Sequence, residues 1–156
     1  MIRSKFAVAV AIVSFCALPL VACSGGGDSG PSVSKQCESL MNANEAGTKK
    51  IEAIKDDDAT ASAKAFQEFA AEVDKLGIKD PELKKLADEY SALLKSAATT
   101  QTSLAALMKK VDAPAASAKA MKSLEKEMDA LEKQVDSYVK NEDQLADKIT
   151  AYCKDK

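Results

Sequence analysis

Apolar residues recur with helical spacing along most of the chain from residue 35 onward. Alanine, lysine, glutamate and leucine dominate this part, and glycine occurs in it only at Gly47 and Gly77. Apolar positions three and four apart lie on one face of a helix, which then packs against a core. The last stretch is the most regular and follows a heptad: Met121, Leu124, Met128, Leu131, Val135, Tyr138, Leu145, Ile149 and Tyr152. Residues 35–156 are therefore predicted to form one all-α domain.

Three breaks divide this helical region. The run Asp56-Asp57-Asp58 offers an N-cap for a following helix, and Gly77 with Asp80-Pro81 is typical of a helix end followed by a new start. The third break is Asp112-Ala113-Pro114, because its proline cannot continue the preceding helix. The three breaks predict four helices.

Cys37 and Cys153 stand near the two ends of the helical region. In an up-and-down bundle the start of the first helix meets the end of the last only if the number of helices is even. A disulfide between the two cysteines would close a loop of about 115 residues, which the chain-entropy model values at about 5 kcal/mol at most. The alternative is a pair of buried free thiols. The cysteines and the breaks together predict an antiparallel up-and-down four-helix bundle.

The four predicted helices differ in length. The first two would span ~30 Å and the fourth ~55–60 Å, so part of the longer hairpin is expected to project beyond the shorter one. Either residues 114–119 form an irregular lead-in to the fourth helix, or one end of the third and fourth helices is a two-stranded coil that exposes apolar surface.

The N-terminus has the pattern of an export signal. Arg3 and Lys5 precede an apolar run over residues 6–20, and the sequence Leu20-Val21-Ala22-Cys23 follows. This quartet resembles the lipobox of bacterial lipoproteins. The resemblance implies that residues 1–22 are a signal peptide that is removed, and that Cys23 is lipidated and anchors the chain to a membrane of the cell envelope. The alternative is an uncleaved membrane helix, for which the apolar stretch is at the lower limit of ~17 residues.

The residues after the lipobox are small and polar. The residue after the cysteine is Ser24 and not an aspartate. In Gram-negative lipoproteins, this resembles the class that is exported to the outer membrane. Glycine and serine dominate up to Ser34, so residues 23–34 are predicted to be a flexible lipidated tether. Removal of Arg3 and Lys5 with the signal leaves 20 basic and 24 acidic side chains, a net charge of −4. This balance argues against a nucleic-acid partner.

The composition excludes most catalytic chemistry. The chain has no histidine and no tryptophan, and its cysteines are assigned to the signal, the lipid and the disulfide. Nucleophilic triads that use histidine are therefore impossible, and zinc would lack its usual ligands. The three aspartates at residues 56–58 lack the spacing of a calcium loop, and no glycine-rich phosphate loop occurs. We expect no catalytic residue, metal or cofactor, and a protein that is not an enzyme.

Two sets of polar residues fall on faces that should point inward. Glu142 lies on the heptad stripe of the last helix, where it would mark an exposed end, pair with a lysine or line a small polar pocket; the exposed end is the favoured interpretation. Asn44 and Thr48 on the first helix and Gln101 on the third are a candidate ligand pocket. The alternative is close helix packing at Gly47, with the polar side chains bonded locally.

Two function classes follow from these features. The first is a membrane-anchored envelope lipoprotein whose bundle is a non-enzymatic interaction or structural module, with another envelope protein as its partner. The alternative is a periplasmic small-ligand or cargo carrier that uses a polar cavity between the first and third helices. A continuous pocket containing Asn44 and Gln101 would favour the carrier, whereas a filled core with an exposed apolar stripe would favour the interaction module.

Overall fold

The computed structural model describes residues 31–55, 58–111, 118–154 and 156 of the chain. The predicted signal peptide 1–22, Cys23 and most of the predicted tether lie outside the described residues, as do Asp56, Asp57 and residues 112–117.

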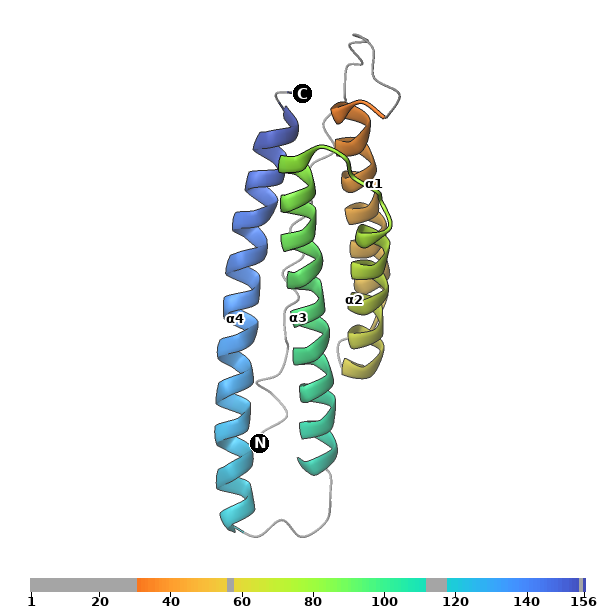
Figure 1. Ribbon diagram of the computed structural model, residues 1–156. Coiled ribbons are helices and arrows are strands. Elements are labelled where there is room, and N and C mark those ends of the chain that lie inside the picture. The colour runs from red at the N-terminus through yellow and green to blue at the C-terminus, as the bar shows by residue number, and fades with distance from the viewer. Residues whose placement is uncertain (1–30, 56–57, 112–117, 155) are drawn as a thin grey trace.

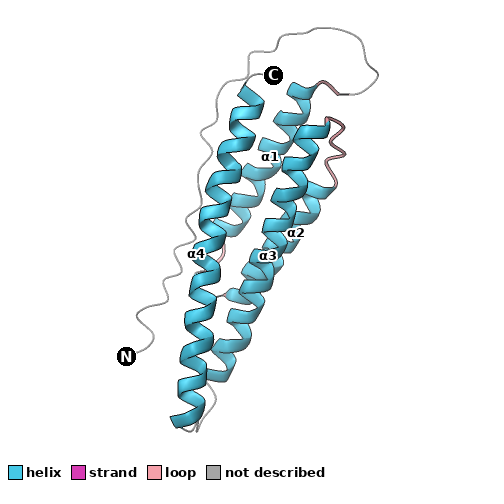
Figure 2. Cartoon of the chain, turned by 60° about the vertical axis from the view of Figure 1, so that its left-hand side comes forward, coloured by secondary structure: helices cyan, strands magenta, loops and turns pink. Residues whose placement is uncertain are grey.

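Four helices make up the described part of the chain. They are α1 (Val33–Glu52), α2 (Ala59–Asp74), α3 (Pro81–Val111) and α4 (Ala118–Lys154), and no strand occurs among the described residues. Consecutive helices run antiparallel and pack side by side (Figure 1). The prediction of an all-α, up-and-down four-helix bundle is confirmed, and a second view shows the same arrangement (Figure 2).

Capping side chains account for the helix starts. The Asp58 side chain accepts a hydrogen bond from the Ala61 backbone N–H at the start of α2. At α3, the Asp80 carboxylate accepts from the backbone N–H groups of Glu82 and Leu83, at 3.1 and 2.8 Å. The loop before it turns at Gly77, whose φ of 62° disfavours other residues. Both helix starts were predicted at these positions.

The first helix begins earlier than predicted. It starts at Val33, inside the segment predicted as tether, because the Ser32 hydroxyl caps it by accepting from the Lys35 N–H. Val33 packs against the core, and the burial of its side chain stabilises the additional turn. The boundary at residue 34 was wrong for this reason.

The core consists mainly of the predicted stripes. Phe69, Leu40, Leu83 and Leu94 are fully buried, and α4 contributes Leu145 and Ile149. The Phe69 ring lies against Gly47 so closely that a Cβ on Gly47 would come within 2.4 Å of it. The predicted close approach at Gly47 is confirmed.

One end of the bundle joins all four helices. The Cα atoms of Cys37 and Cys153 are 5.7 Å apart and their sulfur atoms are bonded, as the even number of helices predicted. Beside the disulfide, the Tyr152 hydroxyl of α4 donates to Asp80 at 2.7 Å. The Gln36 side chain of α1 accepts from the backbone N–H groups of Lys79 and Asp80, at 2.6 and 3.0 Å. These contacts tie the helix ends to the α2–α3 loop.

At the other end, α3 and α4 project beyond α1 and α2 (Figures 1 and 2). The helices have 20, 16, 31 and 37 residues in chain order, which correspond to ~30, ~24, ~46 and ~55 Å. The starts of α1 and α3 and the end of α4 lie at the disulfide end, whereas α2 ends short of it and is connected to α3 by residues 75–80. The extra length of α3 and α4 therefore appears at the opposite end. The exposed two-stranded end is therefore the alternative that the structure supports.

Candidate functional site

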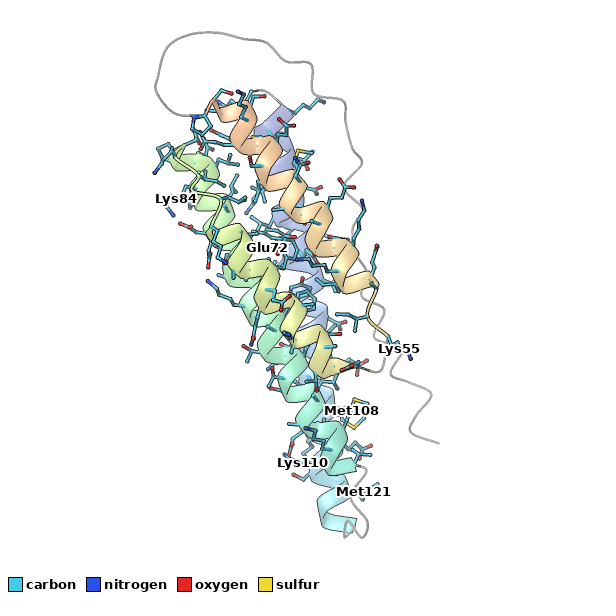
Figure 3. The ribbon with its side chains drawn as sticks, turned by 90° about the vertical axis from the view of Figure 1, so that its right-hand side faces the viewer. Lys55, Glu72, Lys84, Met108, Lys110 and Met121 are labelled. Atoms are coloured by element: carbon cyan, nitrogen blue, oxygen red, sulfur yellow. A yellow bond between two sulfur atoms is a disulfide. The ribbon has the colours of Figure 1, made fainter. Side chains whose placement is uncertain are left out.

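The projecting part of α3 and α4 is the surface that stands out in the described chain. We call it the open hairpin and define it as residues 104–111 of α3 and 118–128 of α4, of which the side chains of 118–120 are not described. Three large apolar side chains are exposed on it: Met108 by 41%, Val111 by 41% and Met121 by 42%. Figure 3 shows Met108 and Met121 beyond the end of α1, where Lys55 is labelled.

Met121 belongs to the heptad of the last helix, which was predicted to pack against a core, and Met108 and Val111 lie on the apolar face of α3. The stripes of α3 and α4 continue to the end of the hairpin, but α1 and α2 end before it and leave one face uncovered. The core prediction was therefore wrong for Met121. Met121, Met108 and Val111 lack the covering helices that bury Leu94 and Ile149.

The two helices of the open hairpin still pack against each other. Leu107 and Leu124 are buried there, with 3% and 8% exposure, although neither belongs to the main core cluster. Lys110 of α3 forms an ion pair with Glu127 of α4 at 3.0 Å. The open hairpin is thus a packed helix pair with one apolar face left open.

Charge is unevenly distributed on this hairpin. The described residues nearest its turn, 108–111 and 121–123, contain three lysines, Lys109, Lys110 and Lys122, and no carboxylate. The next turns of α4, residues 124–133, contain four carboxylates and two lysines. The carboxylates are Glu125, Glu127, Asp129 and Glu132. A basic end is therefore followed by a mainly acidic segment.

A second group of polar side chains lies in the middle of the four-helix segment. The Tyr90 hydroxyl of α3 donates a hydrogen bond to the Asn44 side chain of α1. The Tyr90 ring meets Phe69 edge to face at 5.6 Å, and Tyr138 meets Phe66 in the same way at 5.9 Å. Burial raises the pKa of both tyrosines, so their hydroxyls stay protonated.

Glu142 belongs to this group and is partly buried on α4. Desolvation raises the pKa of its carboxyl to about 7, against the opposing effect of a hydrogen bond with Tyr138. Its charge also raises the pKa of Tyr90, a buried tyrosine of α3. The favoured prediction, that Glu142 marks an exposed end, was wrong. Tyr138 lies one turn away and Tyr90 comes from α3, but Glu142 is not among the residues that line the small pocket beside Asn44.

The candidate pocket residues Asn44, Thr48 and Gln101 are not brought together. A small pocket of about 10 Å³, enough for about one water molecule, is lined by Asn44 but not by Thr48 or Gln101. Its lining residues are Leu40, Met41, Asn44, Tyr90, Ala146 and Ile149. Asn44 is level with Tyr90, and Gln101 lies eleven residues further along α3, about 16 Å away along the axis.

The polar stretch in α3 is satisfied locally. The hydroxyls of Thr99, Thr100, Thr102 and Ser103 each donate to the backbone carbonyl four residues earlier, at 2.8 to 3.1 Å. Such back-bonding was the predicted alternative to a ligand site. It leaves these hydroxyls engaged within their own helix.

Sequence reasoning missed the side chains around the disulfide. Gln36 is buried, and besides the two N–H groups of the α2–α3 loop it binds the Pro31 carbonyl at 2.8 Å. Nothing in its sequence position distinguishes it from the exposed polar residues of α1. Tyr152 was predicted as a core position, and its bond to Asp80 was not.

The described residues contain neither a group of metal ligands nor a helix that could span a membrane. In the described ranges, no three histidine, cysteine, aspartate or glutamate side chains are grouped as ligands for a metal ion. No described helix is both long enough and apolar enough to cross a bilayer. Comparisons of the chain with protein-family models, with curated proteins and with solved structures give no significant match.

Proposed function

We propose that this chain is a membrane-anchored lipoprotein of the bacterial envelope, and that its bundle is a non-enzymatic interaction module. The anchor is supported by the sequence Leu20-Val21-Ala22-Cys23, which resembles a lipobox and assigns the lipid to Cys23. The interaction module is supported by the open hairpin, whose exposed Met108, Val111 and Met121 are the observation that carries the proposal.

The position of the open hairpin suits contact with a partner. It lies at the end of the bundle opposite to the start of α1, ~38–53 Å along α4 from Cys153 (Figure 1). A lipid on Cys23 would hold the chain through the residues before α1, so this attachment leaves the open hairpin uncovered.

The side chains of the open hairpin also suit protein contact. Methionine is flexible and polarisable, and it adapts to irregular apolar surfaces. Lysines beside the two exposed methionines add charge that selects and orients a partner. The buried pair Leu107 and Leu124 keeps the hairpin formed while its open face is free to bind.

The carrier alternative has less support. Its candidate residues Asn44 and Gln101 are separated along the bundle axis, and the pocket beside Asn44 has room for about one water molecule. Small-molecule sites are usually several hundred Å³ in volume. We therefore propose the interaction module alone.

The test compares two variants with the wild type in native membranes. The double variant Met108→Lys/Met121→Lys places two charges on the open face, whereas Ala92→Lys places one on an exposed position of α3 within the four-helix segment. Chemical crosslinking followed by affinity capture should recover a reproducible partner with the wild type and with Ala92→Lys. The double variant should lose it while remaining as helical as the wild type by circular dichroism. Equal recovery with all three proteins would contradict the proposal.

A further inference from the structure

We infer that the open hairpin docks onto the open hairpin of a second copy of this chain, in antiparallel overlap, so that two hairpins complete an intermolecular four-helix segment. This inference rests on the proposed function, because it assumes that the open face makes protein contacts. It names the partner of that face.

The open face lacks the helix pair that covers the same stripes elsewhere in the bundle. Within the bundle, the apolar stripes of α3 and α4 are covered by a pair of antiparallel helices, α1 and α2. Beyond the start of α2 the same stripes continue through Met108 and Met121 without that pair. A second open hairpin is itself an antiparallel helix pair with an apolar face of the same length. It therefore supplies the missing half of a four-helix segment.

Charge fixes the relative direction of the two hairpins. Antiparallel overlap brings the basic end of one hairpin, with Lys109, Lys110 and Lys122, against the acidic segment of the other, with Glu125 and Asp129. A two-fold axis makes this match twice, once in each direction. Parallel overlap would instead set three lysines against three lysines, which is repulsive.

The size of the open face sets the strength of the contact. Stable dimers bury roughly 1,200–2,000 Å² in total, and the open face offers three side chains that are each about 41–42% exposed. The association is therefore weak and concentration-dependent. Part of its strength comes from ion pairs on the surface, so it weakens as the salt concentration rises.

The overlap predicts which positions meet. Met108 lies at the middle of the α3 part of the open hairpin, so a two-fold axis through the overlap brings the two copies of Met108 close together. Ala92 lies sixteen residues earlier on α3, about 24 Å along the axis, so the two copies of Ala92 are about 48 Å apart. In antiparallel overlap, a short crosslinker thus joins the first pair and cannot span the second.

The experiment uses the full chain in native membranes, with Met108→Cys or Ala92→Cys as the added thiol. Cys37 and Cys153 are bonded to each other and do not compete. A short bismaleimide should give a covalent product of twice the chain's mass with Met108→Cys, at a yield at least about tenfold above that with Ala92→Cys. Adding Lys122→Glu, or raising the salt concentration, should lower that yield severalfold. Equal yields at the two positions, or no product of twice the mass, would overturn the inference.

A second reagent separates this inference from the proposed function. A maleimide that carries a photoreactive benzophenone, attached to the thiol of Met108→Cys, also captures partners that have no cysteine. A product of twice the chain's mass again supports the second copy. Products that contain only other proteins overturn the second copy and leave the proposed function standing. If illumination gives no product at all, both fail.

Discussion

At the scale of single residues, Glu142 shows how far an ionisable group can lie from its expected place. Its heptad position pointed inward, yet a charged side chain on such a stripe was interpreted as the mark of an exposed end. The structure places the carboxyl beside Tyr138 and within range of Tyr90, where desolvation raises its pKa to about 7. The free energy of unfolding of the bundle should therefore fall as the pH rises.

The Glu142 carboxyl should destabilise the bundle as the pH rises. Its pKa is about 7 in the folded chain against an ordinary value of 4.5, so the unfolded chain loses the proton first. Below about pH 4.5 the carboxyl is protonated in both the folded and the unfolded chain, so it does not lower the free energy of unfolding. Between about pH 4.5 and pH 7 this free energy declines, and above about pH 7 it is lower by up to about 3 kcal/mol.

The variant Glu142→Gln keeps the shape of the side chain and removes the titration. Urea midpoints should be similar for the variant and the wild type at pH 4.5, and the variant should be the more stable at pH 8. The difference between the two proteins isolates Glu142, because Asp80, whose pKa is lowered by its hydrogen bonds, is present in both. A difference that does not change with pH would contradict the assignment.

Gly47 allows a second test at this scale. A Cβ at this position would meet the Phe69 ring at 2.4 Å, so Gly47→Ala should lower the free energy of unfolding by about 1–3 kcal/mol. In a Phe69→Leu background the same change should cost less, since the ring is gone and alanine favours the helix over glycine. Urea unfolding of the four proteins forms a double-mutant cycle. An equal cost in both backgrounds would show that Phe69 is not the obstacle.

At the scale of helices, the breaks in the sequence predicted most of the structure. Asp58, Gly77 and Asp80 have local roles, as caps and a turn, which neighbouring residues determine and a sequence therefore reveals. The pairing of residues between helices is different. Asn44 and Gln101 were matched because each lies near the middle of its helix, but α1 and α3 both begin at the disulfide end and differ in length. Nothing local to either residue indicates that offset.

The exposure of the open hairpin also depends on how the helices are aligned. Periodicity assigns a face to Met108 and Met121, but only the end points of α1 and α2 decide whether that face is covered. The unequal lengths did predict that part of the longer hairpin projects. Which side chains become exposed depends on tertiary alignment.

The disulfide joins the start of α1 to the end of α4, and its loss should be measurable. Reduction releases a loop that spans a sequence separation of 116, which the chain-entropy model values at about 4–5 kcal/mol as an upper figure. The melting temperature should therefore fall on reduction. The variant Cys37→Ala/Cys153→Ala should melt below the oxidised wild type and should not respond to reductant. Peptide mapping without reduction should find the pair 37–153. Its absence, with unchanged melting on reduction, would contradict the bond.

At the scale of the whole molecule, attachment and folding are expected to be separate properties. Cys23 precedes the described residues, and the first helix begins only at Val33. Cys23→Ala should therefore release the protein from the membrane fraction while its melting temperature stays that of the wild type. Palmitate labelling and globomycin sensitivity of the wild type check the lipid directly. A wild-type chain that takes up no palmitate and remains unprocessed would show that the lipobox interpretation is wrong.

In the cell envelope, the open hairpin is expected to be covered by protein. Methionine oxidation tests it without any substitution, because Met108 and Met121 are exposed in the isolated chain whereas Met41 is half-buried beside the small pocket. Sulfoxide formation is followed by mass spectrometry with the same oxidant in native membranes and in dilute purified protein. Met108 and Met121 should be oxidised several times more slowly in membranes, while the rate at Met41 should not change. If Met108 and Met121 are oxidised as fast in membranes as in dilute purified protein, this expectation is contradicted.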